Sequence, residues 1–384
     1  MLTRMIAALL CLLTLCTPAL AANEEETTMY TYTPTWENVK PLGRTHMLED
    51  SLWLAFSGTG AEFTFHGCRA EVTIAGDMNA TKPANEENQV RIAIYMNGTR
   101  VVDDMIDAKE KTYVVCDLDA AQDVTVRIIK LSETAMSTCG IKAIAVDSAE
   151  GIRPTAAKNR RIEFIGDSIT CGYGVDDEVA EHHFSTATED VTKAYAYKTA
   201  AMLDADYSMV SISGYGIISG YTATGEEKIT AQTIPQFYEK LGFSYGTYQR
   251  KIAASIKWDF AAFQPDLIVV NLGTNDDSYT LDHPERQEEY CTAYTAFLKK
   301  VRANNPDAKI LCTLGVMGDR LYPFVEKAAA AYTAETGDHN IACMRFVPQL
   351  ASDGYAADWH PTETTHNKAA AKLTAEIRTL MGWN

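Results

Sequence analysis

Hydrophobic and polar residues alternate in short runs between about residue 41 and residue 148. The clearest runs are Glu62–Phe65, Arg91–Tyr95 and Val124–Ile129, and the stretch before them, residues 23–40, is polar and expected to fray. Alternation with a period of two is typical of strands that bury one face. Asn97-Gly98 separates two of the runs and favours a tight hairpin. With no helical segment in between, the pattern predicts a β sandwich or jelly roll over residues 30–150.

The pattern changes after residues 149–159, a polar stretch that we interpret as a domain boundary. Beyond it, continuous apolar runs alternate with segments of helical periodicity. The predicted strands are Arg161–Ile165, Tyr207–Ile212, Asp266–Leu272, Lys309–Leu314 and Ala342–Val347, and the predicted helices are Thr192–Leu203, Glu285–Ala303, Leu321–Thr336 and His366–Met381. Continuous apolar strands are buried on both faces. The alternation therefore predicts an α/β domain over residues 160–384, with helices on both faces of a parallel sheet.

Composition and charge narrow the range of functions. Of the 384 residues, 46% are hydrophobic and 22% are charged, which is typical of a globular protein. The formal net charge is −17, so nucleic acid and anionic membrane surfaces are disfavoured as partners. A neutral polymer or a small neutral ligand fits such a surface better.

The N-terminus predicts the compartment. Arg4 precedes an apolar run, Met5–Cys16, that is too short to span a bilayer, and Ala19-Leu20-Ala21 forms a small-x-small cleavage site. Residues 1–22 therefore resemble a signal peptide cleaved after Ala21 or Ala22, and we expect a secreted protein. Seven cysteines remain after cleavage, without a CxxC pair. They are interpreted as mostly buried free thiols, with one disulfide in the N-terminal domain as the alternative.

Four short motifs follow the predicted strands, and ligands of parallel sheets bind beyond the carboxyl ends of the strands. They are Gly166–Thr170, Ser213–Gly216, Gly273–Asp276 and Asp358–Pro361. Together they supply a hydroxyl nucleophile, a flexible glycine, a side-chain amide and a carboxylate–imidazole pair. These are the groups that acyl transfer needs.

The four motifs, in this order, resemble those of SGNH (GDSL-type) hydrolases. The N-terminal β region, the longer motif Gly166–Gly174 and the motif Asp358–Pro361 make the chain most similar to carbohydrate esterase family 2. The resemblance implies a flavodoxin-like SGNH domain with a five-stranded parallel sheet after a jelly roll. It also implies a secreted serine esterase that needs no metal or cofactor and removes acetyl groups from plant polysaccharides such as xylan, mannan or glucomannan.

The expected roles combine simple chemistry with this resemblance. A serine hydroxyl needs a base to act as a nucleophile, so Ser168 and His360 are the predicted pair. The resemblance nominates the backbone N–H groups of Ser168 and Gly214 and the amide of Asn275 as oxyanion donors. Trp359 and Tyr215 are the predicted substrate-binding aromatic residues.

The sequence leaves open which group orients the imidazole of His360. Many SGNH enzymes carry the carboxylate three residues before the histidine, where this chain has Ala357. Asp358 lies two residues before His360, as in carbohydrate esterase family 2, and is the predicted third member of a triad. The alternative is a backbone carbonyl that orients the imidazole, with the Asp358 carboxylate facing the substrate.

Several residues have competing interpretations. His283, before a predicted helix, is interpreted as a helix cap, and Asp167 likewise. Gly242–Gly246 matches G-x-S-x-G by its letters, but it lacks the preceding strand and is interpreted as a loop around Ser244. For the whole chain the alternatives are a lipid esterase or lysophospholipase of the same superfamily, and a carbohydrate-binding protein with an inactive site. The sequence leaves the oligomeric state open.

Overall fold

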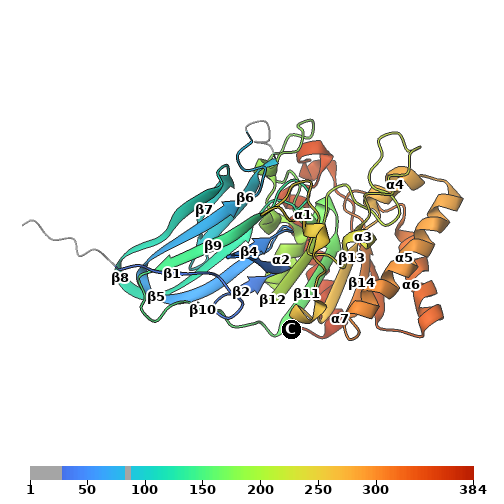
Figure 1. The fold of residues 1–384 in the computed structure, drawn as a ribbon. Coiled ribbons are helices and arrows are strands. Elements are labelled where there is room, and N and C mark those ends of the chain that lie inside the picture. Colours follow the sequence, from blue (N-terminus) through green and yellow to red (C-terminus); the bar gives the residue numbers. More distant parts are fainter. Residues whose placement is uncertain (1–27, 83–87) are drawn as a thin grey trace, which may run out of the picture.

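The computed structural model describes residues 28–82 and 88–384, which form a β-rich unit beside an α/β unit (Figure 1). The predicted signal peptide, residues 1–22, lies outside the described residues. Both units agree with the fold class expected from the sequence: an antiparallel β domain followed by a flavodoxin-like α/β domain.

Ten described strands form the hydrogen-bonded network of the β-rich unit. They are β1 (Tyr30–Tyr32), β2 (Lys40–Leu42), β3 (Thr45–Leu48), β4 (Ser51–Leu54), β5 (Gly60–Gly76), β6 (Val90–Met96), β7 (Thr99–Ile106), β8 (Glu110–Lys130), β9 (Cys139–Val146) and β10 (Arg153–Pro154). The long strands β5 and β8 pair with each other. Along its other edge, β5 pairs first with β2 and β10 and then, nearer its C-terminal end, with β9. The apolar residues of the alternating runs fill a core between these strands.

A tight turn and an open strand edge account for two features of this unit. Asn97 and Gly98 both have positive φ, +48° and +83°, which the two-residue hairpin between β6 and β7 requires, so the hairpin prediction is confirmed. The expectation that residues 23–40 fray is wrong for Tyr30–Tyr32. This short segment pairs with β9 as β1, because the edge of β9 offers unpaired backbone groups that a tripeptide can satisfy.

The α/β unit has five parallel strands in the order β12-β11-β13-β14-β15. Their bounds are β11 (Arg160–Gly166), β12 (Ala205–Ser211), β13 (Leu267–Asn271), β14 (Lys309–Leu314) and β15 (Ile341–Arg345). The described α-helices are α1 (Ser168–Cys171), α2 (Tyr195–Met202), α3 (Ile234–Phe237), α4 (Thr274–Thr280), α5 (Pro284–Asn304), α6 (Tyr322–Thr336) and α7 (Glu363–Met381). The strand order reverses between β11 and β13, and such a switch point opens a crevice at the carboxyl ends of the strands.

Helices cover both faces of the parallel sheet, as the continuous apolar strands predicted. Successive strand residues point to opposite faces: Val269 packs in a cluster with residues of α2 and α7, and Val270 in a cluster with residues of α5 and α6. The sheet is therefore rigid from strand to strand, and it fixes the positions of the loops that follow β11, β12 and β13.

The two units are joined through a buried segment, residues 131–138, which connects β8 to β9 and is called the connecting segment below. The backbone N–H of Val191 donates to the carbonyl of Leu131 at 3.3 Å, and that of Tyr245 donates to Ala135 at 2.9 Å. An ion pair of 3.1 Å between Arg44 and Glu163, both buried, crosses the same boundary. The β-rich unit thus contacts the loops at the carboxyl edge of the parallel sheet.

Candidate active site

Ser168 and His360 meet at the carboxyl edge of the parallel sheet. β11 ends at Gly166, and Ser168 is the first residue of α1. The carboxylate of Asp167 accepts the Ile169 N–H at 3.0 Å, which is the N-cap role predicted for it. His360 lies in the loop before α7, and its Nε2 is 2.9 Å from the Ser168 Oγ. Two residues 192 positions apart are thereby within hydrogen-bonding distance.

The imidazole of His360 is oriented by a backbone carbonyl. Its Nδ1 is 3.1 Å from the carbonyl oxygen of Asp358. A carbonyl can only accept, so Nδ1 carries the hydrogen and the Nε2 lone pair faces Ser168. Burial lowers the pKa of His360 to about 4, although the Asp358 carbonyl and carboxylate act in the opposite direction. The ring is therefore neutral at pH 7, as a general base must be.

The carboxylate of Asp358 does not contact His360, which corrects the predicted triad. It accepts hydrogen bonds from the Tyr173 hydroxyl at 2.8 Å and from the Phe184 backbone N–H at 2.9 Å, and it lies 3.1 Å from Nδ1 of the exposed His183. Burial opposes its ionisation, but these hydrogen bonds outweigh burial and hold the pKa of Asp358 below its ordinary value. The carboxylate of Asp358 thus links its own loop to the loop that contains Tyr173 and Phe184.

Backbone conformation explains why the carbonyl and not the carboxylate faces the ring. Asp358 and Trp359 both have positive φ, +50° and +62°. Two consecutive residues in the left-handed region reverse the chain tightly, so the Asp358 carbonyl faces the His360 ring while its side chain leaves on the other side. Asp tolerates this conformation better than most residues do. The D-x-H spacing in the sequence is compatible with either arrangement.

Tyr173 contacts His360 through its ring, and the sequence alone assigns it no role. Its centroid is 4.0 Å from that of His360, with 27° between the planes, and 4.1 Å from that of Phe184, with 20° between the planes. The three rings form a stack that ends on the His360 imidazole. A signal was available, because Tyr173 lies within the motif Gly166–Gly174, but nothing in the sequence pointed its ring at His360.

The predicted oxyanion donors follow β12 and β13. Gly214 has a φ of +80°, and a Cβ at this position would meet no atom within 4 Å, so the backbone here is open to an approaching group. Its carbonyl accepts the Tyr221 N–H at 2.9 Å. Asn275, in the first turn of α4, donates from Nδ2 to the Tyr215 carbonyl at 2.9 Å, and the same nitrogen lies 3.4 Å from Asp167 Oδ2.

A buried carboxylate holds the loop after β12 against α4. Asp276 accepts the backbone N–H groups of Ile217, Ile218 and Ser219 at 2.7–3.1 Å. Burial raises the pKa of Asp276 to about 6 despite these hydrogen bonds, and it raises the pKa of Asp167 to about 7. The motifs after β11, β12 and β13 therefore share one network of buried polar contacts.

The two predicted substrate-binding aromatic residues differ in exposure. Tyr215 is 3% exposed and its ring packs against Phe237 and Phe243, so the structure does not place this predicted substrate contact at the surface. An apolar pocket formed by neighbouring rings stabilises it more than an open position would. Trp359, in contrast, is 54% exposed and immediately precedes His360 in the chain, with its ring 5.3 Å from that of Tyr355.

The competing residues lie in structural positions. His283 occupies the N-cap position of α5 and is 3.7 Å from Glu285. Ser244 is buried in a loop, and its hydroxyl oxygen accepts the Gly246 N–H at 3.1 Å. Neither the G-x-S-x-G letters nor the Asp-His-Pro sequence around His283 forms a catalytic arrangement.

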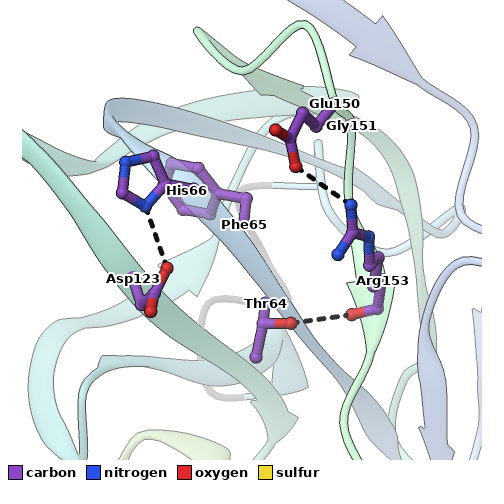
Figure 2. A pocket seen from close by; sticks show the side chains of 7 residues that line it. All are labelled: Thr64, Phe65, His66, Asp123, Glu150, Gly151 and Arg153. Carbon is purple, nitrogen blue, oxygen red and sulfur yellow. Dashed lines mark hydrogen bonds and ion pairs between the residues drawn. The ribbon is translucent and has the colours of Figure 1, made fainter.

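A cavity of about 580 Å³ lies on the β-rich unit and contains none of the four motifs (Figure 2). Its charged groups pair with one another: His66 with Asp123 at 2.9 Å and Arg153 with Glu150 at 3.0 Å. The lining residues are Thr64, Phe65, His66, Asp123, Glu150, Gly151 and Arg153. The volume of this cavity lies within the range of about 300–1,000 Å³ that is usual for ligand pockets, but its charged side chains already contact each other.

Other features bear on the sequence predictions. Within residues 28–82 and 88–384, no group of three or more His, Cys, Asp or Glu side chains is arranged to hold a metal ion. No helix in the described part of the chain is long and apolar enough to cross a membrane. All seven cysteines predicted to remain after cleavage are free thiols, and five of them are buried.

Sequence families match the two units separately. The profile described as "GDSL-like Lipase/Acylhydrolase family" matches residues 164–368, and "Carbohydrate esterase 2 N-terminal" matches residues 42–155. The chain belongs to the GDSL-like lipase/acylhydrolase family. Membership places it among carboxylic ester hydrolases, and it has the two-part arrangement of family 2 carbohydrate esterases.

Curated relatives of this GDSL-like chain come from two bacteria. The Cellulase/esterase CelE of Acetivibrio thermocellus is 30% identical over 338 residues, which are 86% of this chain and 38% of that protein. This chain therefore spans well under half the length of CelE. An Acetylxylan esterase / glucomannan deacetylase of Cellvibrio japonicus is 26% identical over 349 residues, 90% of each protein.

Solved structures share the two-part fold of the GDSL-like chain. A family two carbohydrate esterase from Clostridium thermocellum, solved in complex with cellohexaose, is 27% identical with a TM-score of 0.76, and the match covers 90% of this chain and 100% of that one. An acetyl xylan esterase, Est2A, from Butyrivibrio proteoclasticus has a TM-score of 0.80 at 23% identity, covering 92% and 99%. At the latter identity the likeness concerns the fold alone.

Proposed function

We propose that this chain is a serine O-acetylesterase that removes acetyl groups from plant polysaccharides. The observation that carries the proposal is the 2.9 Å contact between Ser168 Oγ and His360 Nε2, with Nδ1 turned to a backbone acceptor. This arrangement is a nucleophile with its base in the correct tautomer. The names of the Cellvibrio japonicus relatives support the choice of acetylated xylan or glucomannan as substrate.

Acylation begins when Ser168 Oγ attacks the acetyl carbonyl and its proton passes to His360 Nε2. The imidazolium that forms keeps its Nδ1–H on the Asp358 carbonyl, whose dipole stabilises the positive charge. Nε2–H then donates to the departing sugar oxygen, so the carbon–oxygen bond breaks as the alcohol is protonated. The products of this half-reaction are the free sugar hydroxyl and an acetyl group on Ser168.

The negative charge of the tetrahedral intermediate needs donors that are already in place. We assign this role to the backbone N–H groups of Ser168 and Gly214 and to the Asn275 amide. One N–H of Asn275 is held by the Tyr215 carbonyl at 2.9 Å, which fixes the plane of the amide. Its Nδ2 makes a longer contact of 3.4 Å with Asp167 Oδ2, which the oxyanion would replace. Because Gly214 carries no side chain, the substrate can approach its backbone closely.

Deacylation repeats these steps with water as the nucleophile. His360 Nε2 takes a proton from the water, the water oxygen attacks the acetyl carbon, and Ser168 leaves with the proton returned by the imidazolium. Acetic acid is released, ionises to acetate in solution, and the serine is regenerated. The neutral resting state of His360 allows the base to act in both half-reactions.

Trp359 is the proposed contact with the sugar. It is more than half exposed and immediately precedes the base in the chain, so a pyranose ring on its face would hold an acetylated hydroxyl near Ser168. A polysaccharide also suits a chain with a net charge of −17, because the substrate is uncharged. The polymer therefore meets no long-range repulsion.

Steady-state turnover by the wild-type chain and Ser168→Ala tests the function. The substrates are acetylated xylan, acetylated glucomannan, and 4-nitrophenyl acetate and octanoate. We expect acetate release from at least one polymer, preference for acetate over octanoate, and no turnover by Ser168→Ala in a chain with the wild-type Tm. Preference for octanoate would indicate a lipid esterase, and polymer binding without turnover would indicate a binding protein with an inactive site.

Secretion is part of the proposal and rests on residues 1–22, which resemble a signal peptide. The expected mature N-terminus follows Ala21 or Ala22. N-terminal sequencing of the protein recovered outside the cytoplasm checks this, and a mature chain that begins at Met1 would contradict it.

A further inference from the structure

We propose that Glu133 of the β-rich unit is a positioning residue for the oxyanion-binding loop of the α/β unit. The inference rests on the proposed function, because it concerns the donor that Gly214 supplies. Glu133 lies in the connecting segment and is fully buried, and its Oε2 accepts the backbone N–H of Ser213 at 2.8 Å. Ser213 directly precedes Gly214.

The contact fixes one end of a short span whose other end is also held. Upstream of Gly214, the Ser213 N–H is tied to Glu133. Downstream, the Gly214 carbonyl accepts the Tyr221 N–H at 2.9 Å. The Gly214 N–H lies between these two anchors, in a residue whose φ of +80° and missing side chain give it more conformational freedom than its neighbours. Without the upstream anchor, glycine could turn this N–H away from the oxyanion.

Glu133 is itself held in place by a second buried acid. Its backbone N–H donates to Oε2 of Glu189 at 2.7 Å, and Glu189 is also fully buried. The Lys130 ammonium donates to the carbonyls of Ser132 and Glu133 at 2.5 and 2.7 Å. The backbone of Glu133 is thus held at both its N–H and its carbonyl, and this places the buried carboxyl group beside the Ser213 N–H.

The electrostatic state of this group is consistent with a positioning role. Burial raises the pKa of Glu133, against the Ser213 hydrogen bond and the Lys130 charge, and burial together with the Glu133 charge raises the pKa of Glu189. A carboxyl oxygen accepts an N–H whether the group is ionised or protonated, so the contact with Ser213 does not depend on the charge of Glu133.

Three variants separate positioning from simple stability. Glu133→Met has a similar volume and no acceptor, so kcat on 4-nitrophenyl acetate should fall about 10-fold to 100-fold, short of the roughly 10²–10³ expected when an oxyanion donor is deleted. KM should change less than about twofold. Glu133→Gln keeps an acceptor oxygen and should restore kcat to within about threefold of the wild type.

Thr134→Val is the matched control from the same connecting segment. Its hydroxyl donates to the Phe243 carbonyl and does not contact the loop that carries Gly214. We expect a lower Tm with wild-type kcat. If Thr134→Val loses as much kcat as Glu133→Met, or if Glu133→Gln loses as much as Glu133→Met, the effect is general or depends on charge, and the proposal is wrong.

Hydrogen exchange of the Ser213 amide in the wild-type chain provides a test that needs no variant. An amide bound to a fully buried acceptor should be protected at least about 10³-fold relative to an unstructured peptide. Free exchange would overturn the proposal even if Glu133→Met does not fold, and so would wild-type kcat in a folded Glu133→Met. This measurement is independent of turnover, so absence of esterase activity and absence of the Glu133 contact are separate results.

Discussion

Replacement of Asp358 by Asn distinguishes a triad from a dyad oriented by a backbone carbonyl. Where a carboxylate orients the catalytic histidine, exchange of Asp for Asn lowers kcat about 10⁴-fold, or about 5.5 kcal/mol of transition-state stabilisation. In this chain the orienting acceptor is the Asp358 carbonyl, 3.1 Å from His360 Nδ1, and it survives the substitution. Asn also tolerates the φ of +50°. We therefore expect Asp358→Asn to retain kcat within about tenfold.

The remaining cost concerns stability. The carboxylate accepts hydrogen bonds from Tyr173 and Phe184 at 2.8 and 2.9 Å, and its side chain is one-third exposed. A hydrogen bond to a charged group contributes about 1.5–3 kcal/mol when buried, and exposure reduces this. Asp358→Ala loses both hydrogen bonds and places Ala in the left-handed region, so its free energy of unfolding should fall by about 2–4 kcal/mol. Asp358→Asn should lose about half as much.

The assay is kcat on 4-nitrophenyl acetate, with the free energy of unfolding from urea titration of the same samples. Substrate concentrations above KM separate chemistry from binding, and a low temperature keeps Asp358→Ala folded. A loss of about 10³-fold or more in kcat for a folded Asp358→Asn would refute the carbonyl-oriented dyad.

Three further predictions concern the same site. Asn275→Ala should lower kcat about 10²–10³-fold with little change in KM, as measured by steady-state kinetics, because one oxyanion donor is lost; a change confined to KM would mean that Asn275 only binds substrate. Burial lowers the pKa of His360 to about 4. Because a base must be neutral to accept a proton, kcat/KM measured against pH should stay constant from neutral pH down to about pH 5 and fall at lower pH with an apparent pKa of about 4. A fall in kcat/KM with an apparent pKa of about 6.5, the ordinary value for histidine, would contradict the buried, neutral ring. Tyr173→Phe keeps the ring stacked on His360 and should change kcat less than about threefold. Tyr173→Ala removes a ring contact of about 0.5–1.5 kcal/mol and should lower kcat about 2-fold to 12-fold. Equal kcat values for the two variants would show that the stacked ring does not position His360.

Elements with strong periodicity are predictable from the sequence. The apolar run Lys309–Leu314 predicts β14 at its observed bounds, and α6 begins one residue after its predicted start. In an α/β unit, a continuous apolar run is stable as a buried strand and a helical apolar stripe is stable as a helix packed on the sheet. The sequence pattern does not predict α4. Its residues Thr274–Thr280 are nearly all polar, and it forms because it follows β13 and holds Asp276 against the preceding loop.

The site is predictable where chemistry restricts the choice of residue. A hydroxyl, an imidazole and an amide at strand ends indicate Ser168, His360 and Asn275. Which atom of Asp358 faces the ring depends on two positive φ angles, and the burial of Tyr215 depends on Phe237 and Phe243, which the chain places more than 20 residues away. Neither is encoded in a local pattern. Glu133 lies 80 residues before Ser213 and belongs to no motif, so only the folded chain reveals the contact.

The buried connecting segment limits how this protein can be divided or recombined. A shortened chain that begins near residue 160 would contain all four motifs, yet it would expose the carbonyl of Phe243 and the amides of Val191, Ser213 and Tyr245, which are bound in the intact chain to residues 131–135. It would also leave Glu163 buried without Arg44. The β-rich unit is thus not a detachable accessory module, and an exchange of catalytic units between relatives would have to carry residues 131–138 along with them.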